Sequence, residues 1–403
     1  MATTSKELTL EDVNLASKRI YPFIHKTPLD YSKTFSDLSG SSVYLKLENL
    51  QKTGSFKVRG ALNKLLSMPK NLTAGGVITA SAGNHAQGVA YAAASLGIKA
   101  TVVMPKWASE AKIKATKSYG ADVLLYGSYF DDAVSKAKSI SQELNIPYIP
   151  AFDDDDIIAG QGTIALEILE EKPDLDVILV PIGGGGLISG IALAAKSIKD
   201  IKIIGVESDA FPAVHEILNG RRPEFGNTIA DGIAVKSPSP RTIHYIEKYV
   251  DEVVLVNDNE IAKAMFLLLE RAKTVVEAAG AVGIAALLSK KVDAKGKNIG
   301  VLLSGGNVDV HLLSRVIDRA LLDFGRMMII SFVAPDRPGI LAAALSIIAE
   351  EGANVLHVQH DREGSDVPLG FTKIKIWMEI PETHSKESLL KKLTLLYPTV
   401  KEG

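Results

Sequence analysis

The chain of 403 residues is long enough for two or three domains, and its 46% hydrophobic and 23% charged residues are ordinary for a globular protein. A formal net charge of −2 gives no reason to expect a nucleic-acid partner. The sequence has no cysteine, which excludes disulfide bonds, thiolate zinc sites and a cysteine nucleophile.

No membrane segment is expected. The longest apolar run, Ala278 to Leu288, is shorter than the roughly 18 residues that a membrane helix needs. Met1 to Asn14 is polar and charged, unlike a secretory signal. We therefore expect a cytoplasmic protein.

Strand and helix patterns alternate along most of the chain. Leu8 to Ile24 predicts an amphipathic helix, and Asp258 to Lys290 a long helical stretch. Strands are predicted at Val43 to Leu47, Val77 to Ala80, Ala100 to Met104, Asp122 to Tyr126, Tyr148 to Phe152, Val177 to Pro181, Lys202 to Val206 and Ile299 to Leu303. This alternation predicts an α/β fold with a parallel sheet. Because sites lie at the carboxyl ends of such strands, we expect the turns Ser81–Asn84 and Gly183–Gly186 at one edge.

The pattern changes between Leu322 and Arg326. The segments that follow are a strand at Met327 to Val333, a helix ending near Gly352, two paired strands at Asn354 to His360 and Phe371 to Ile380, and a helix at Ser385 to Leu396. This β-α-β-β-α order predicts a small α+β, ferredoxin-like domain. A last strand can extend no further than about Tyr397 to Val400. We place the two domains at 1–325 and 326–403.

Lys57 stands where a polar turn passes into a helix. Thr53, Gly54 and Ser55 are turn and N-cap residues, and apolar residues recur at helical spacing from Val58 onward. A cation is disfavoured near the positive end of a helix. Lys57 is therefore biased toward the neutral amine, the form that condenses with a carbonyl. Taken alone, a solvated surface lysine is the commoner interpretation.

The four glycines Gly183, Gly184, Gly185 and Gly186 follow a predicted strand and open a helix, where backbone N–H groups bind phosphate. A Walker loop is excluded because Ile191 stands at the position of its lysine. The dinucleotide fingerprint fails because Ile188 or Ser189 occupies its third glycine. The alternative is that the glycines only allow tight packing of the strand against the helix.

Two further polar turns follow predicted strands. The N–H groups of Ser81-Ala82-Gly83-Asn84-His85 can hold a substrate carboxylate, although an ordinary serine N-cap explains the turn equally well. Ser304-Gly305-Gly306 offers a hydroxyl, but alone it is more simply a turn. An amine, a phosphate cradle, a carboxylate cradle and a hydroxyl together indicate a phosphate-bearing aldehyde cofactor and an amino-acid substrate. Pyridoxal phosphate fits that description.

Five stretches, in chain order, resemble the fold-type II pyridoxal-phosphate enzymes and most of all the threonine dehydratases (threonine ammonia-lyases), with serine racemase close by. They are Lys52 to Gly60, Ser81 to Gly88, Gly160 to Thr163, Gly183 to Gly190 and Ser304 to Asn307. The resemblance covers roughly residues 10 to 322 and implies a two-lobed fold with mainly parallel sheets, the smaller lobe roughly at 46–150. It also implies pyridoxal 5′-phosphate and β-elimination of L-threonine to 2-oxobutanoate and ammonia, with L-serine giving pyruvate.

The same resemblance implies roles for individual residues. Lys57 would form the Schiff base and then remove the Cα proton, with Phe56 packed beside it. Asn84 would bond the cofactor's phenolic oxygen, and Ser304 would face the pyridine nitrogen. The phosphate would be held by Gly183, Gly184, Gly185, Gly186 and Leu187. The substrate would be held by Ser81, Ala82, Gly83, Asn84 and His85.

Some matches leave alternatives open. Serine racemase has a serine base where this chain has Ala82, which favours dehydration over racemisation. Glu207 resembles part of the racemase metal site, but Phe211 and Ala213 replace other ligands, so a solvated carboxylate is as good an explanation. Glu277 resembles a family segment near the ring, the alternative being a carboxylate on a helix face.

Two further features have structural interpretations. His85 is assigned no proton transfer, because a packed histidine at a helix start is the commoner case. The run Asp153 to Asp156 is interpreted as an N-cap and dipole partner rather than as a metal site.

Met327 to about Val400 resembles an ACT domain on the stretches Asp336 to Ile340 and Ala349 to Asn354. This implies an amino-acid or nucleotide effector near Gly339 and Asn354, and a homo-oligomer, either dimer or tetramer; the alternative is a domain that only dimerises. For the whole chain we expect a regulated threonine dehydratase, placed for instance in isoleucine biosynthesis. The alternatives are a serine racemase or serine dehydratase, and a non-catalytic amino-acid sensor.

Overall fold

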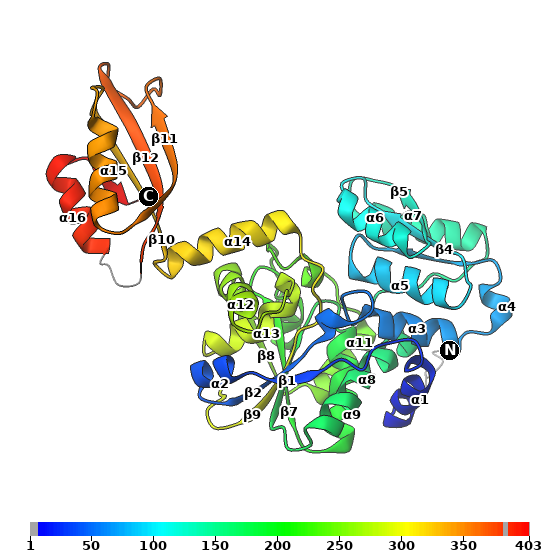
Figure 1. Cartoon of the computed structure of the whole chain (residues 1–403). Helices are drawn as coiled ribbons and strands as arrows, with labels where there is room; N and C mark the ends of the chain where they lie inside the picture. The colour runs from blue at the N-terminus through cyan, green and yellow to red at the C-terminus, as the bar shows by residue number, and fades with distance from the viewer. Residues whose placement is uncertain (1–6, 382–385, 403) are drawn as a thin grey trace. The chain divides into compact units, whose positions relative to one another are not determined.

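The computed structural model describes residues 7–381 and 386–402. The chain divides into two compact units, Met1–Val310 and His311–Gly403 (Figure 1). This division lies upstream of the boundary expected at residue 325, because helix α14 (Val310–Asp323) groups almost entirely with the second unit. The domain limits 1–325 and 326–403 stay a prediction.

A six-stranded sheet forms the larger lobe of the first unit, with its strands in the order β1-β2-β9-β6-β7-β8 (Figure 1). These strands are β1 (Leu29–Tyr31), β2 (Ser42–Lys46), β6 (Val177–Pro181), β7 (Lys202–Ser208), β8 (Glu252–Val256) and β9 (Asn298–Leu302). All neighbours are parallel except β1 and β2. Strand β6 is buried along its whole length, as its uninterrupted apolar run requires.

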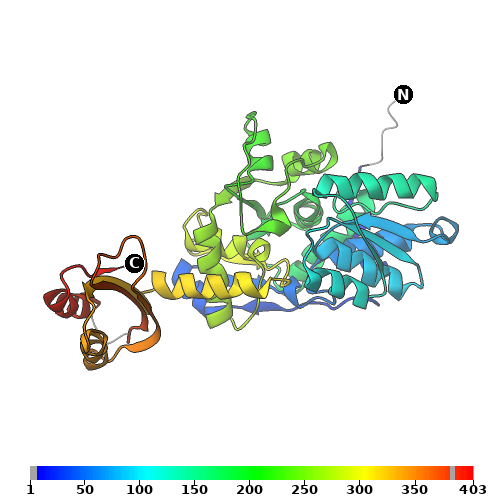
Figure 2. The same ribbon diagram turned by 90° about the horizontal axis from the view of Figure 1, so that it is seen from above.

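A second, three-stranded parallel sheet, β3-β4-β5, forms the smaller lobe. Its strands are β3 (Val77–Ala80), β4 (Ala100–Met104) and β5 (Asp122–Leu125), and its helices are α5 (Asn84–Ser95), α6 (Glu110–Ser118) and α7 (Phe130–Glu143). Figure 2 shows this sheet between α5 and α7. Val77 packs toward the α5 core and Ile78 toward α7, so the strand is buried on both faces. The predicted two-lobed α/β fold is confirmed.

The prediction that both polar turns lie at one sheet edge was wrong. Ser81–Asn84 follows β3 in the small sheet, whereas Gly183–Gly186 follows β6 in the large one. Strand–helix alternation looks the same in both sheets and does not say which strands pair. The two turns can therefore meet only across the lobes.

The remaining helices of the first unit are α1 (Leu10–Ile20), α2 (Lys33–Ser39), α3 (Lys57–Ser67), α4 (Lys70–Thr73), α8 (Asp155–Glu171), α9 (Gly186–Ile198), α10 (Ala213–Leu218), α11 (Pro240–Tyr249), α12 (Asp258–Arg271) and α13 (Ala278–Leu288), with short 3₁₀ turns at Glu48–Leu50 and Asp231–Ile233. Helix α3 packs against both α5 and α8, and α8 packs against α9. Within the described ranges, every helix is too short or too polar to cross a membrane.

Two predicted elements differ from the structure. The stretch Asp258 to Lys290 is two helices, because Lys273 adopts a left-handed conformation (φ 57°) and β-branched residues follow it. Tyr148 to Phe152 is not a strand: it makes a single bridge, between Tyr148 and Ile78. The backbone carbonyl of Ile149 instead accepts hydrogen bonds from side chains.

The second unit contains an antiparallel sheet with the order β11-β12-β10-β13. Its elements are β10 (Met327–Pro335), α15 (Ile340–Glu350), β11 (Asn354–Asp361), β12 (Phe371–Glu379), α16 (Lys386–Leu396) and β13 (Lys401–Glu402). Both helices pack on one face of the sheet (Figures 1 and 2). The predicted α+β order is confirmed; Ser385, the expected start of the last helix, lies outside the described residues.

The prediction for the last strand was wrong. Residues 397–400 form a turn in which Val400 N–H donates to the Tyr397 carbonyl. The Tyr397 ring is buried and stacks on Phe332 with centroids 4.4 Å apart, which holds this turn against the core. Strand β13 therefore begins only at Lys401, and its two residues complete the sheet beside β10.

Candidate active site

Lys57 is the first residue of α3, as predicted from the turn before it. Its side chain is half-buried, and its Nζ donates to the carbonyl of Ala151 at 3.1 Å and lies 5.1 Å from the centre of the Phe56 ring. Burial lowers the pKa of Lys57 to about 8, while the Glu277 carboxylate acts in the opposite direction. The alternative of an ordinary solvated lysine does not describe this environment.

The lowered pKa predicts unusual reactivity in the cofactor-free protein. Since an amine reacts when neutral, labelling of Lys57 should rise with pH around a midpoint of about 8. At pH 7.5 the neutral fraction is then about 200-fold larger than for a lysine of pKa 10.5. Labelling at a series of pH values, read by mass spectrometry, measures the midpoint. Glu277→Gln should lower it, because the carboxylate favours the ammonium; a midpoint above 10 would contradict the prediction.

Residues 149–152 connect Lys57 to the glycine loop. The Ala151 carbonyl accepts from Lys57, and the next residue, Phe152, packs against the loop. A Cβ at Gly184 would lie 2.2 Å from the Phe152 ring, and one at Gly186 would lie 2.9 Å from the Phe152 Cβ. Sequence reasoning missed Phe152, since no motif surrounds it. The one indication in the sequence is that Gly184 and Gly186 have no side chains, so that another side chain must pack against them.

The glycine loop forms the N-terminus of α9. Gly185 is the N-cap with φ 89°, a conformation that favours glycine, and it provides no side-chain cap. The first-turn N–H groups, including that of the buried Leu187, have no partner within the helix. Tight packing explains why Gly184 and Gly186 lack side chains, but it supplies no partner for these N–H groups. A bound phosphate would supply one.

Ser304 is joined to the lysine turn through the backbone. Its carbonyl accepts from Phe56 N–H at 3.1 Å, and Gly305 forms a β-bridge with Ser55. Ser304 is buried at the carboxyl end of β9. Lys57 and Ser304, far apart in sequence, are therefore fixed relative to each other by hydrogen bonds.

Asn84 links the smaller lobe to the larger one. Its Nδ2 donates to Glu277 Oε1 at 2.6 Å, and its Oδ1 accepts from Asn307 Nδ2 at 2.8 Å. Glu277 is a buried N-cap residue of α13 rather than a carboxylate on a helix face. Burial, reinforced by the Asp231 carboxylate, raises the pKa of Glu277 to about 7. A hydrogen-bonded network of three side chains, Asn84, Glu277 and Asn307, thus joins the two lobes.

The rest of the second turn has modest local roles. Ser81 Oγ accepts from Gly83 N–H at 3.2 Å, but Gly83 is the N-cap of α5, so the serine N-cap alternative was wrong. His85 is buried, and its Nε2 lies 3.0 Å from the Ile149 carbonyl. Burial and the Lys57 charge lower the pKa of His85 to about 3, so the ring is neutral. That His85 has no proton-transfer role stays a prediction. Ala82 lies between these residues and is half-buried.

Neither metal alternative has a ligand set. Glu207 is buried, not solvated, and its carboxylate accepts from Val214 N–H at 2.9 Å and His215 N–H at 2.8 Å at the start of α10. In the Asp153 to Asp156 run, Asp154 caps α8, as predicted. Across residues 7–381 and 386–402, no three His, Asp or Glu side chains are grouped so that they could hold a metal ion.

The second unit holds a cavity of about 390 Å³ around Gly339, the N-cap of α15. Its lining is Asp336, Arg337, Pro338, Gly339, Ile340, Leu341, Ala342, His360, Arg362 and Thr372. Asn354 is not among these residues: it starts β11, where its Nδ2 donates to Glu379 at 3.3 Å. It lies about 20 Å from the His360 end of the strand. The structure therefore does not bring the two predicted effector residues together in one chain.

The first unit has the groups that a phosphate-bearing aldehyde requires: a half-buried amine of low pKa, and uncapped amides at a glycine-lined helix start. Residues 20–305 match the family of pyridoxal-phosphate dependent enzymes, and residues 328–394 match the ACT domain. The chain belongs to the pyridoxal-phosphate dependent enzyme family and carries an ACT domain. Pyridoxal phosphate is accordingly its cofactor.

Among this family, the chain is similar to L-threonine ammonia-lyases. It is 48% identical to that of Thermotoga maritima, over 94% of this chain and 96% of the relative. It is 47% identical to that of Geobacter sulfurreducens, over 90% and 92%. The solved threonine deaminase isoform 2 of Solanum lycopersicum matches with a TM-score of 0.74 and 37% identity, over 78% of this chain and 87% of that one. Maize serine racemase matches with a TM-score of 0.73 and 35% identity, over 79% and 100%.

Proposed function

We propose that this chain is an L-threonine ammonia-lyase, which converts L-threonine to 2-oxobutanoate and ammonia and also L-serine to pyruvate and ammonia. The observation that carries the proposal is Lys57, an amine of lowered pKa joined through Ala151 and Phe152 to an uncapped glycine loop. The relatives named L-threonine ammonia-lyase, similar along nearly the whole chain, support the choice of substrate.

Each part of the site has its own role in the proposed reaction. Bound pyridoxal phosphate supplies the electron sink that makes the substrate Cα–H bond labile. Lys57 holds the cofactor and then accepts the Cα proton, for which an amine of pKa about 8 is well suited. Amides of Gly183 to Leu187 would hold the phosphate, and those at the start of α5 would hold the substrate carboxylate. The Ser304 hydroxyl would be a neutral partner for the ring nitrogen, which would make the cofactor a weaker electron sink and favour elimination.

Product analysis tests the proposal. The purified protein is incubated with pyridoxal phosphate and either L-threonine or L-serine, and 2-oxobutanoate, pyruvate and D-serine are measured. We expect the oxo acids to dominate, because Ala82 offers no hydroxyl to return a proton on the opposite face. D-Serine as the main product would instead identify a serine racemase. No covalent uptake of the cofactor would favour a non-catalytic sensor.

We propose further that an amino acid or nucleotide binds the cavity around Gly339 and regulates the enzyme. Ending the chain at Leu322 should leave catalysis intact and remove the effector response, because the cavity residues all lie beyond that point. Initial rates with and without isoleucine, valine or AMP measure the response in both forms. A truncated enzyme that still responds would place the regulatory site in the first unit.

Three broader statements belong to this proposal. We infer that the chain forms a homo-oligomer, acts in the cytoplasm and serves isoleucine biosynthesis. The ACT domain supports the homo-oligomer, and the similarity to L-threonine ammonia-lyases supports a role in amino-acid metabolism.

A further inference from the structure

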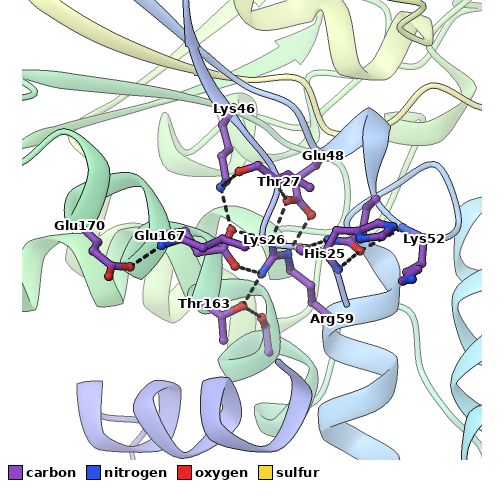
Figure 3. Close-up of polar contacts among 12 residues, drawn as sticks. His25, Lys26, Thr27, Lys46, Glu48, Lys52, Arg59, Thr163, Glu167 and Glu170 are labelled. Atoms are coloured by element: carbon purple, nitrogen blue, oxygen red, sulfur yellow. Dashed lines mark hydrogen bonds and ion pairs between the residues drawn. The ribbon is translucent and has the colours of Figure 1, made fainter. Parts of the chain in front are cut away.

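Four charged side chains without exposed surface lie together around Arg59, which follows Lys57 by two residues in the chain (Figure 3). We call them the buried charge cluster: Lys46, Glu48, Arg59 and Glu167. The guanidinium of Arg59 contacts both carboxylates. It bonds Glu48 at 2.7 and 2.8 Å and Glu167 at 2.6 and 2.9 Å. Lys46 Nζ reaches Glu167 at 2.7 Å.

The cluster is completed by neutral groups. The hydroxyl of Thr27 donates to Glu48 at 2.5 Å, and its carbonyl accepts from Lys46 at 2.6 Å. Arg59 also donates to the hydroxyl of Thr163 at 3.1 Å. Figure 3 shows these partners converging from the segment before β1, from β2 and the turn after it, and from α3 and α8. Two positive and two negative charges balance, so the cluster is formally neutral.

A buried charge cluster is weak evidence for a gain in stability. Removing charges from water is costly, and replacing buried ion pairs by apolar side chains of similar volume is often neutral or stabilising. The cluster fixes the orientation of its members. The planar guanidinium of Arg59 makes a pair of hydrogen bonds to each carboxylate, and each pair forms in only one geometry. The cluster ties the first turn of α3 to α8 and to the end of β2.

Helix α3 has other contacts as well. Its buried apolar side chains pack in the core of the smaller lobe, and further along Asn63 and Lys64 bond α8 and its N-cap residue. Close to Lys57, two approaches involve the backbone. A Cβ at Gly88 on α5 would lie 3.0 Å from the carbonyl carbon of Lys57. One at Gly160 on α8 would lie 2.7 Å from the carbonyl oxygen of Arg59. Glycine contacts let helices approach closely, but they lack the side-chain ridges that fix how one helix lies along another. The bonds of Arg59 supply such a restraint in the first turn of α3, two residues from Lys57, while those of Asn63 and Lys64 act further along the helix.

We propose that the buried charge cluster positions Lys57, with Arg59 fixing α3 so that the amine is held for capture of the cofactor. The inference rests on the proposed role of Lys57. Arg59 is a positioning residue that acts by geometry. The cluster's charges cancel, and the pKa of Lys57 is set by burial and Glu277.

The test removes the charges without leaving one unpaired. A quadruple variant, Lys46→Met, Glu48→Leu, Arg59→Met and Glu167→Leu, retains bulk, and Arg59→Lys retains the charge but not the fork. The control is Lys26→Ala with Glu170→Ala. Lys26 and Glu170 are 2.8 Å apart and exposed by 48% and 69%, and Glu170 lies about one turn along α8 from Glu167.

Three readouts are taken on cofactor-free protein. They are the melting temperature, the midpoint pH for labelling of Lys57, and the rate at which pyridoxal phosphate becomes trapped on Lys57 by borohydride. We expect the quadruple variant to melt like the wild type and keep its midpoint, yet to capture the cofactor about tenfold to a hundredfold more slowly. Arg59→Lys should also be slow, and the control should match the wild type.

Each result either supports or overturns the positioning role of the cluster. A folded quadruple variant that captures at the wild-type rate overturns the inference, and so does slow capture that merely follows a shifted midpoint. Should the quadruple variant not fold, Arg59→Lys decides by the same readouts. If the wild type itself traps no cofactor on Lys57, the proposed function fails, a result distinct from failure of the positioning role.

Discussion

Replacing Lys57 with alanine should lower kcat for L-threonine by about 10⁴-fold, the upper range for loss of a general base. The same change should abolish the borohydride-trapped cofactor adduct. Both effects follow from one amine, because Lys57 is proposed to hold the cofactor and then to accept the Cα proton. Its lowered pKa and its bond to the Ala151 carbonyl are the physical basis. Oxo-acid release and mass spectrometry of the reduced protein measure the two losses.

The matched control is Lys52→Ala. Lys52 belongs to the same turn but is exposed, and its loss should leave both turnover and the adduct unchanged. Lys57→Ala protein must also retain the wild-type melting temperature, which is expected because the change removes no buried partner other than one carbonyl. An adduct that survives on another lysine of the Lys57→Ala protein would refute the assignment.

The candidate site could be predicted in those parts that depend on local sequence. Lys57 at the first turn of α3 follows from turn residues and apolar spacing, and the glycine loop follows from a strand, four glycines and a helix. The Asp154 cap is local in the same way. Each of these signals lies within about ten residues, so no knowledge of strand pairing was needed.

Contacts between distant segments could not be predicted in this way. The alternation of strands and helices did not reveal that β3 and β6 belong to different sheets. Nothing near Phe152 marks it as the packing partner of Gly184. Arg59 looks like a surface residue in the sequence, and its burial depends on carboxylates 11 and 108 positions away. Charged residues inside a core are the hardest to foresee, since composition predicts them outside.

Gly190→Ala should destabilise the first unit by about 3 kcal/mol, the upper part of the usual range for overpacking. A Cβ at Gly190 would lie 2.2 Å from the Ile158 carbonyl oxygen and 2.7 Å from Gly162 N. Both obstacles are backbone of α8, which cannot rotate away as a side chain can. Helices α8 and α9 must therefore separate. Denaturant unfolding followed by circular dichroism measures the loss.

Gly226→Ala is the control for the change itself. Its Cβ would find only the Ala210 Cβ, at an ordinary 3.6 Å, so its stability should stay within about 0.5 kcal/mol of the wild type. The contact at Gly190 also matters for the site, because α9 begins with the phosphate loop and α8 carries Glu167 of the buried charge cluster. Gly190→Ala protein that is still folded should hold pyridoxal phosphate more weakly. If the Gly190→Ala protein were as stable as the Gly226→Ala protein, helices α8 and α9 could separate without a loss of stability. Their backbone contact would then not be what holds the glycine loop in place.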